Sequence, residues 1–279
     1  MCRLYAHLAV RPLSVAGVLV DDKHSLLKQS CGDLRGETHG DGWGIGYFER
    51  GSPRVFRSPN AARESPEYDV AARKVVSPIV LAHVRQASVG SRLAENAHPF
   101  AYGHWLFMHN GTVTGFAEIR ERILAEIDPD LRSKIEGTTD SEHVFYWLLS
   151  RLRRAGQATE WDKVAAADRA SADISLVTRV IAEAIPILDA WSVATGPEEP
   201  SKLNFVLSDG VSLVASRFKH NLNWLKSGPV AGQGRATDGD LPPAVRVASE
   251  PVGDQTWDPV PDGHVLSIGP DLTTRLTAI

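Results

Sequence analysis

The sequence begins MCRLY (residues 1–5), which places a cysteine directly after the initiator methionine. If Met1 is removed, Cys2 carries a free α-amine beside its thiol. A thiolate is a strong nucleophile, and an α-amine with a pKa of about 7.7–8.0 can accept a proton at cellular pH. One residue would then supply both nucleophile and general base, as in enzymes with an N-terminal nucleophile. The alternative is that Cys2 is a small buried apolar residue.

The composition is that of an ordinary globular protein and argues against several functions. The 279 residues carry a net charge of -4 and are 43% hydrophobic, which suits a sizeable core. This balance disfavours a nucleic acid or an anionic membrane as partner. No apolar run approaches a membrane span, and the start lacks a secretory signal pattern. Cys2 and Cys31 alone make no disulfide framework, so we expect a cytoplasmic protein. No linker signal isolates a second domain, so we expect one domain over 1–279.

Short aromatic and β-branched stretches alternate with periodic helical segments. Strands are predicted at 43–48, 53–58, 78–84, 104–109, 244–249 and 263–268, and a hairpin over 202–216. Helices are predicted at 115–127, at 139–156 with a Thr139–Glu142 capping box, and over 161–195 with a break near Pro186. Residues 227–243 have the composition of a Gly/Pro-rich loop. Clustered strands favour an α+β fold over a regular parallel sheet.

Two motifs offer groups that could bind an anion or stabilise developing charge. Arg85 follows the apolar stretch VLAHV (80–84). Its planar guanidinium suits a bidentate contact with a carboxylate, although a surface salt bridge is the alternative. In MHNGTVTG (108–115), Asn110 and Gly111 are typical of a type I′ hairpin turn. Alternatively, the Asn110 side-chain amide and the Gly111 N–H form an oxyanion hole. Both pairs of alternatives stay open at this point.

Two further stretches carry ionisable groups. Asp140, in TTDSE (138–142), lies in the first turn of the predicted helix, where it either interacts with the helix dipole or binds a substrate ammonium group. His98 stands in AENAHPF (94–100). The chain has no HExxH motif and no Cys/His cluster with zinc spacing, so we expect no metal site. The stretch THGDGWGIGYF (38–48) matches neither a P-loop nor GxGxxG, so no cofactor is expected, and its glycines are expected to permit close packing or a bulge.

The order of these motifs resembles the class II glutamine amidotransferases. After the cysteine at position two come DGWGIG, AHVRQAS, NAHPF, HNG and TTDSE, while LSDGVSLVASR and VASEPVG resemble the closing strands of that domain. The resemblance spans nearly the whole chain. It implies an N-terminal-nucleophile (Ntn) hydrolase fold, which is a four-layer αββα sandwich of two mostly antiparallel sheets. Residues 155–200 would be a helical elaboration of that fold.

The resemblance also implies catalytic roles. Cys2 would attack a γ-glutamyl amide, and its own amine would shuttle the proton. Asn110 and Gly111 would form the oxyanion hole. A γ-glutamyl thioester would form, ammonia or an amine would leave, and water would release glutamate.

The same resemblance implies a set of substrate-binding residues. Arg85, helped by the Ser88 hydroxyl, would hold the α-carboxylate of the glutamyl group. Asp140 would bind its α-ammonium group, and His98 belongs to this set. Glutamine presents one carboxylate, one ammonium and one amide carbonyl, so the chain offers a matching cation, anion and donor pair.

The chain departs from glucosamine-forming relatives in ways that bear on function. Gln86 stands where those relatives have an aromatic residue, and Val89 stands where they have histidine. The chain also has no length for a synthase domain. We therefore expect a stand-alone hydrolase of glutamine or another γ-glutamyl amide. The alternatives are a glutaminase subunit that delivers ammonia to a separate synthase partner, and a catalytically silent γ-glutamyl-binding module. The partner subunit would be a synthase or a hydrolase. The leaving group, which residues 227–243 would contact, is left open.

Overall fold

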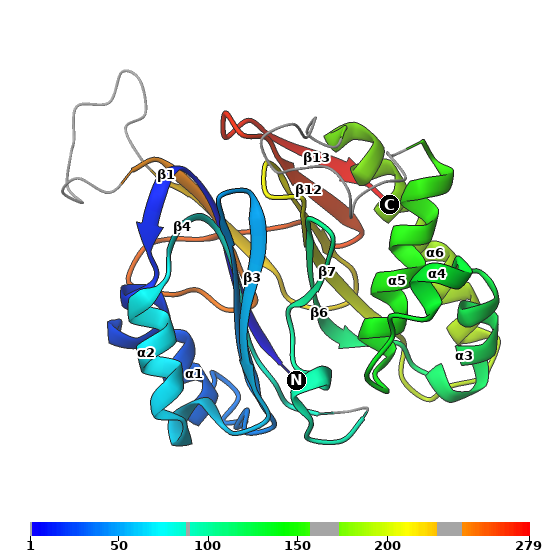
Figure 1. Ribbon diagram of the computed structural model, residues 1–279, viewed down its shortest axis with the longest axis horizontal. Coiled ribbons are helices and arrows are strands. Elements are labelled where there is room, and N and C mark those ends of the chain that lie inside the picture. The colour runs from blue at the N-terminus through cyan, green and yellow to red at the C-terminus, as the bar shows by residue number, and fades with distance from the viewer. Residues whose placement is uncertain (1, 88–89, 157–172, 228–241) are drawn as a thin grey trace.

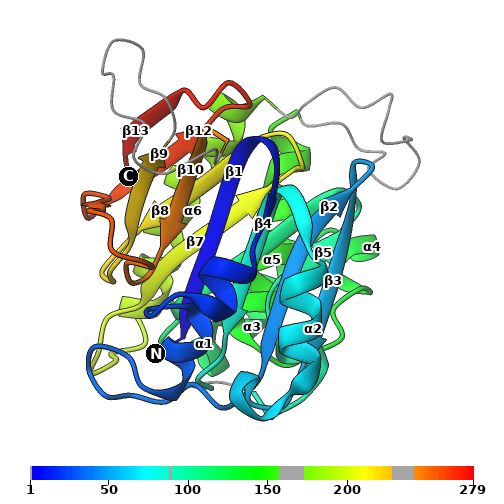
Figure 2. The ribbon, with the colours of Figure 1, turned by 90° about the vertical axis from the view of Figure 1, so that its left-hand side faces the viewer.

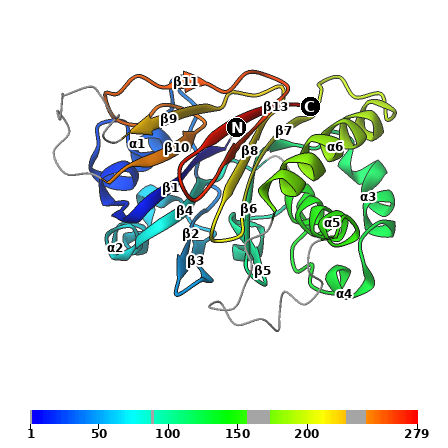
Figure 3. The ribbon, with the colours of Figure 1, turned by 90° about the horizontal axis from the view of Figure 1, so that it is seen from above.

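Four layers make up the fold. The computed structural model describes residues 2–87, 90–156, 173–227 and 242–279. Two antiparallel sheets lie face to face, and helices cover the outer face of each sheet (Figures 1 and 3). The layers run helix, sheet, sheet, helix, which confirms the α+β class and the four-layer αββα sandwich that the resemblance implies.

The N-terminal strand lies inside the first sheet. This sheet has seven strands in the order β11-β9-β10-β1-β4-β2-β3. Their bounds are Arg3–Ser14 (β1), Trp43–Glu49 (β2), Ser52–Ser58 (β3), Val76–Val84 (β4), Asn223–Ser227 (β9), Ala244–Ala248 (β10) and Asp258–Pro259 (β11). The first strand pairs with β4 on one side and with β10 on the other. The start of the chain is therefore held between two strands.

The second sheet has six strands in the order β13-β12-β8-β7-β6-β5. Their bounds are Phe100–Tyr102 (β5), Trp105–Thr112 (β6), Lys202–Ser208 (β7), Leu213–Arg217 (β8), His264–Ile268 (β12) and Thr274–Ala278 (β13). The hairpin predicted over 202–216 is confirmed, because β7 pairs antiparallel with β8 across an Asp209–Gly210 turn. Gly210 has φ +87° there, a conformation that favours glycine.

Helices of different length cover the two sheets. On the first sheet, Figure 2 shows α1 (Leu26–Cys31) and α2 (Pro66–Lys74) lying over the strands. The second sheet is covered by α3 (Phe116–Ala125), α4 (Pro129–Arg132), α5 (Asp140–Arg154) and α6 (Ile174–Val193). Short helical turns occur at Gly17–Asp21 (η1), Ala62–Glu64 (η2) and Ala94–Asn96 (η3).

Three buried apolar clusters fill the three interfaces between layers. The cluster between the two sheets contains Leu4 and Met108. A second cluster, which contains Trp43 and Tyr68, lies between the first sheet and its helices. The third contains Phe145 and joins the second sheet to α3, α5 and α6. Because side chains alternate along a strand, Leu4, Ala6 and Leu8 of β1 face the central cluster, while Tyr5 faces the helices on the outer side.

Two predicted details of the helices differ in the structure. Thr139 Oγ1 accepts from the Glu142 amide at 3.3 Å, as a capping box requires. The Glu142 carboxylate, however, accepts from the amides of Glu136 and Gly137, so the box is only half formed. The expected break at Pro186 is wrong, because α6 continues through it, and residues on both sides of Pro186 are buried in the core. The described part of the elaboration over 155–200 is helical, as expected, while 157–172 lie outside the described residues.

Candidate functional site

Strand alternation directs Cys2 and Arg85 into the space between the sheets. Leu4 belongs to the central cluster, and Cys2, two residues earlier, lies on the same side. Leu81 of β4 belongs to the same cluster, which places Arg85, four residues later, on that side too. The pairing of Arg3 with Val84 brings the two ends together. The thiol and the guanidinium are therefore neighbours at one end of the inter-sheet space.

The Cys2 side chain is buried and contacts the main chain after β4. Its residue is 8% exposed, and Sγ lies 3.3 Å from both the amide nitrogen and the carbonyl oxygen of Gln86. Burial raises the pKa of the Cys2 thiol, although the Gln86 amide and the positive charge of Arg85 act in the opposite direction. The thiol therefore needs a base to become a nucleophile at neutral pH.

Arg85 is a buried cation in contact with the loop that follows it. Its guanidinium donates to the carbonyls of Asp41 and Ser91 at 3.3 and 3.1 Å and to that of Gly90 at 3.4 Å. Burial lowers the pKa of Arg85, while Cys2, Asp41 and Asp140 act to raise it. Arg85 thus lies within electrostatic reach of both Cys2 and Asp140. This burial contradicts the alternative of a surface salt bridge.

Asn110 and Gly111 lie inside a strand, so the hairpin-turn interpretation is wrong. Both belong to β6, where they pair with Asn204 and Leu203 of β7. Met108 faces the central cluster, so Asn110 faces it as well. Its side chain is fully buried, and neither its amide nitrogen nor its oxygen has a hydrogen-bond partner among the described residues. A buried amide with unused donors is the group that an oxyanion hole requires.

Asp140 begins α5 and holds the end of β6. It is 3% exposed, and its carboxylate accepts from the Val113 amide at 2.7 Å and from the Ser141 amide at 2.8 Å. Ser141 in turn contacts His109, whose Nδ1 lies 3.0 Å from Oγ. The carboxylate therefore joins the helix N-terminus to the strand that carries Asn110 and Gly111.

His98 packs against the first sheet at a place that only glycine permits. A Cβ on Gly44 would lie 2.1 Å from the His98 carbonyl oxygen, and one on Gly46 would lie 2.6 Å from Pro99 Cγ. The expectation that the glycines of DGWGIG permit close packing is therefore confirmed. The His98 ring lies 4.3 Å from the ring of His83, centroid to centroid. Burial lowers its pKa well below the ordinary value, so the imidazole is neutral.

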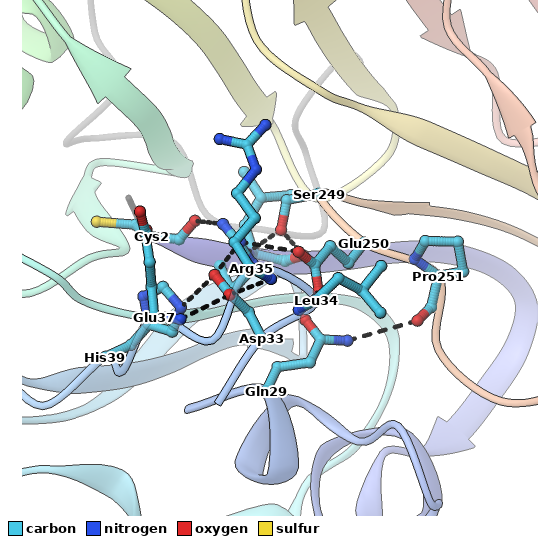
Figure 4. A network of polar contacts seen from close by, with 12 residues as sticks. Cys2, Gln29, Asp33, Leu34, Arg35, Glu37, His39, Ser249, Glu250 and Pro251 are labelled. Atoms are coloured by element: carbon cyan, nitrogen blue, oxygen red, sulfur yellow. Dashed lines mark hydrogen bonds and ion pairs between the residues drawn. The ribbon is translucent and has the colours of Figure 1, made fainter. Parts of the chain in front are cut away.

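Sequence reasoning missed a group of charged residues around the main chain of Cys2. Figure 4 shows Asp33, His39 and Glu250 grouped near Cys2. Arg3 contacts the carboxylates of Asp33 and Glu250 as well as the Cys2 carbonyl. It also missed Asp41 of DGWGIG, whose carboxylate accepts from the Ala87 amide at 2.8 Å. The partners come from separate segments of the chain, and spacing in the sequence carries no signal for them.

The remaining findings concern two predicted regions that the structure does not describe, metal ligands, membrane-spanning helices and a hollow away from the site. Ser88 and most of 227–243 lie outside the described residues. Across the ranges that the structure describes, no three His, Cys, Asp or Glu side chains are arranged to hold a metal ion. Within the same ranges, no helix combines the length and apolar character needed to cross a membrane. A hollow of about 890 Å³ lies between α6 and the β12–β13 edge and contains none of the site residues above.

Sequence comparison finds relatives along most of the chain. Residues 25–269 match the family described as "Glutamine amidotransferases class-II", a range that includes Arg85, Asn110 and Asp140 but starts after Cys2. A probable glutamine amidotransferase of Saccharomyces cerevisiae is 29% identical over 78% of this chain, which spans 64% of the yeast protein. A γ-glutamyl-hercynylcysteine sulfoxide hydrolase of Mycobacterium tuberculosis is 27% identical, over 96% of this chain and 93% of that protein.

Comparison with solved structures identifies the fold. A glutamine aminotransferase class-II domain protein of Silicibacter pomeroyi superposes with a TM-score of 0.65 and 23% identity, covering 100% of this chain and 99% of that one. The glutamine phosphoribosylpyrophosphate amidotransferase of B. subtilis superposes with a TM-score of 0.61 and 14% identity, over 99% of this chain and 49% of that one. These likenesses confirm the expected Ntn-type amidotransferase sandwich.

Proposed function

Since the chain belongs to the class II glutamine amidotransferases, we propose that it hydrolyses a γ-glutamyl amide through a thioester on Cys2. The substrate is glutamine or a γ-glutamyl peptide or conjugate. We assign Cys2 as nucleophile, Asn110 and Gly111 as oxyanion hole, Arg85 and Ser88 as the carboxylate site, and Asp140 as the ammonium site. We also assign His98, whose ring packs against that of His83, to the substrate-binding residues.

One observation carries this proposal. The buried Arg85 guanidinium adjoins Gln86, whose amide contacts the Cys2 thiol, and the charges of Cys2 and Asp140 act on it. A glutamyl group needs a cation for its α-carboxylate, an anion for its α-ammonium group and a nucleophile at its γ-carbonyl. Two opposite charges and a thiol at one end of the inter-sheet space match that pattern.

The reaction follows from these positions. With Met1 removed, the Cys2 amine takes the thiol proton as sulfur attacks the γ-carbonyl carbon. The oxyanion that forms accepts hydrogen bonds from the Asn110 amide and the Gly111 N–H, in a dry interior where such bonds are strong. The intermediate collapses, and the leaving amine takes the proton from the Cys2 ammonium group. Water then attacks the thioester and releases glutamate and the free thiol.

The stand-alone form of this activity has the better support. The mycobacterial γ-glutamyl hydrolase matches this chain over almost the whole length of both proteins. We accordingly propose a single domain over 1–279 that needs no synthase partner. Two free cysteines suit a reducing cytoplasm.

The first test is the intact mass of the protein before and after treatment with 6-diazo-5-oxo-norleucine, a glutamine-like alkylator. The untreated mass reports whether Met1 is removed. We expect one adduct, located on Cys2, slowed by excess glutamine, present in Cys31→Ala and absent in Cys2→Ala. Glutamate release from glutamine and from γ-glutamyl peptides is then measured.

The other outcomes separate the alternatives. A trimmed chain that forms no adduct and releases no glutamate overturns the hydrolase proposal. If turnover then appears only on adding a synthase, the chain is a glutaminase subunit. If a γ-glutamyl ligand binds without turnover, it is a silent binding module.

A further inference from the structure

Cys2 precedes β1 and lies just before the first paired residue of the first sheet. The β1–β4 ladder begins with the Arg3–Val84 pair, and the β1–β10 ladder begins with Tyr5 and Ala248. A residue before these pairs is not fixed by the ladder, and a terminal residue is held by a peptide bond on one side only. Its thiol contact with Gln86 is one anchor. A nucleophile that must meet a carbonyl at a fixed angle needs a second anchor.

The Arg3 side chain supplies that second anchor. Nη1 donates to the Cys2 carbonyl at 3.0 Å, and Nη2 contacts the carboxylates of Asp33 and Glu250, the latter at 2.8 Å. The Arg3 side chain is 4% exposed, that of Asp33 is 0% exposed and that of Glu250 is 12% exposed. The guanidinium is therefore held between two carboxylates, and its planar fork keeps several contacts in one geometry.

The carboxylate of Asp33 is itself fixed from several sides. It accepts from the amides of Arg35 and Glu37 at 2.8 and 2.9 Å, and His39 Nε2 lies 3.1 Å away. Burial would raise the pKa of Asp33, but these hydrogen bonds and the Arg3 charge together lower it. Burial lowers the pKa of His39 to about 4, so its ring is neutral and donates to Asp33. Asp33 is thus a rigid, charged platform for Arg3 at neutral pH.

The second carboxylate, that of Glu250, comes from a segment that is distant in the sequence from Arg3. Glu250 follows β10, and its neighbour Ser249 accepts from the Leu4 amide through Oγ at 3.0 Å and donates its own amide to the Leu4 carbonyl at 3.1 Å. The segment 249–250 and the loop 33–39 therefore clamp the first residues of the chain from two directions.

We propose that Arg3 is a positioning residue, held by Asp33 and Glu250, that fixes the main chain of Cys2 so that its thiol meets the γ-carbonyl of the substrate. This proposal rests on the proposed function, in which Cys2 is the nucleophile. Arg3 touches neither the substrate nor the reacting atoms and acts only through Cys2. Loss of the anchor therefore affects the chemical step and leaves substrate affinity intact.

The test compares Arg3→Met and Arg3→Lys with Arg153→Met in the full chain. Arg153 is a matched control, because its side chain is 12% exposed and pairs with Asp130 at 2.8 Å at the far end of α5. We expect Arg3→Met to lower kcat about 100-fold with KM unchanged, as for a reacting group displaced by about 1 Å. Lysine keeps the charge but not the fork, so Arg3→Lys melts near the wild-type temperature and still loses about tenfold in kcat. Arg153→Met lowers the melting temperature and leaves kcat unchanged.

A second readout does not depend on glutamyl chemistry. Alkylation by iodoacetamide is followed separately for the Cys2 and Cys31 peptides by mass spectrometry. We expect Arg3→Met to speed alkylation of the buried Cys2 about tenfold, because the terminal segment opens more often, while the exposed Cys31 serves as an unchanged internal reference.

The outcomes separate this proposal from the proposed function. A trimmed wild-type chain that forms no adduct and releases no glutamate overturns the hydrolase proposal, yet its Cys2 alkylation still decides whether Arg3 anchors the terminus. If Arg3→Lys retains full kcat, or if both Arg3 variants and Arg153→Met behave alike in kcat and in alkylation, Arg3 is merely structural.

Discussion

Replacement of Gly111 by alanine tests whether the geometry around the proposed oxyanion hole demands glycine. A Cβ at this position would lie 1.8 Å from the Lys202 carbonyl oxygen and 2.6 Å from its carbon, both main-chain atoms of β7. Ordinary contacts of this kind begin near 3.4 Å. The two strands would have to separate locally by more than 1 Å, about a quarter of the usual strand spacing.

The expected cost combines two losses. The Lys202 carbonyl also accepts from His109 Nε2 at 2.9 Å, and a displaced carbonyl gives up that bond, worth about 1 kcal/mol. Overpacking of a closed site costs a further 1–3 kcal/mol or so. We therefore expect Gly111→Ala to lower the free energy of unfolding by about 2–4 kcal/mol, or the melting temperature by about 3–7 °C.

Urea unfolding followed by circular dichroism measures this change, with Gly32→Ala as the control. A Cβ on Gly32 meets nothing within 4 Å, and its φ of 178° is extended backbone, so alanine there should change stability by less than about 1 kcal/mol. If Gly111→Ala is as stable as Gly32→Ala, the tight β6–β7 contact does not exist in solution, and steric demand does not explain the glycine.

Three further predictions concern catalysis and pH. Cys2→Ala should reduce glutamate release by more than about 10⁴-fold while calorimetry still detects substrate binding; normal turnover by this variant excludes the thioester mechanism. Asp140→Asn should raise KM about tenfold or more for substrates with a free α-amine but not for their N-acetylated analogues, and equal effects on both would remove Asp140 from the ammonium site. Burial lowers the pKa of His7 and of His39 from 6.5 to about 4. The unfolded chain therefore binds more protons between these pH values. The contribution of the two histidines to the free energy of unfolding is complete above pH 6.5 and is lost as pH falls towards 4. Each histidine should cost about 2 kcal/mol at pH 5, so a urea midpoint that is constant from pH 7 to 5 contradicts neutral burial.

The sequence predicts the strong local patterns well. Most strands and the two periodic helices are confirmed within a few residues, because turn residues bound them and their apolar spacing is regular. The first strand was not predicted, since RLYAHLAVRPLS lacks clear alternation and is buried on both faces over its first half. The Asn110–Gly111 turn was the natural local expectation, but pairing with distant Asn204 overrides it. Long-range pairing decides such cases, and short-range rules do not contain it.

The candidate site divides in the same way. Cys2, Arg85, Asn110 and Asp140 stand in recognisable motifs, and the structure places them at neighbouring strand and helix ends. The anchor of Arg3, Asp33 and Glu250 was not predicted, because its three members come from three separate regions of the chain. A buried ionic contact leaves no periodicity in a sequence, so only the folded arrangement reveals it.

The interior position of β1 has a consequence for how the protein is made. Tyr5 pairs with Ala248, so the first strand cannot be enclosed on both sides until the ribosome has synthesised the segment around residue 248. Until then one edge of β1 lacks its partner strand β10, and we expect the N-terminus to be accessible to the aminopeptidase that would trim Met1. Pairing of such distant segments is also slow to form. The fold thus gives time for this processing before the nucleophile is enclosed.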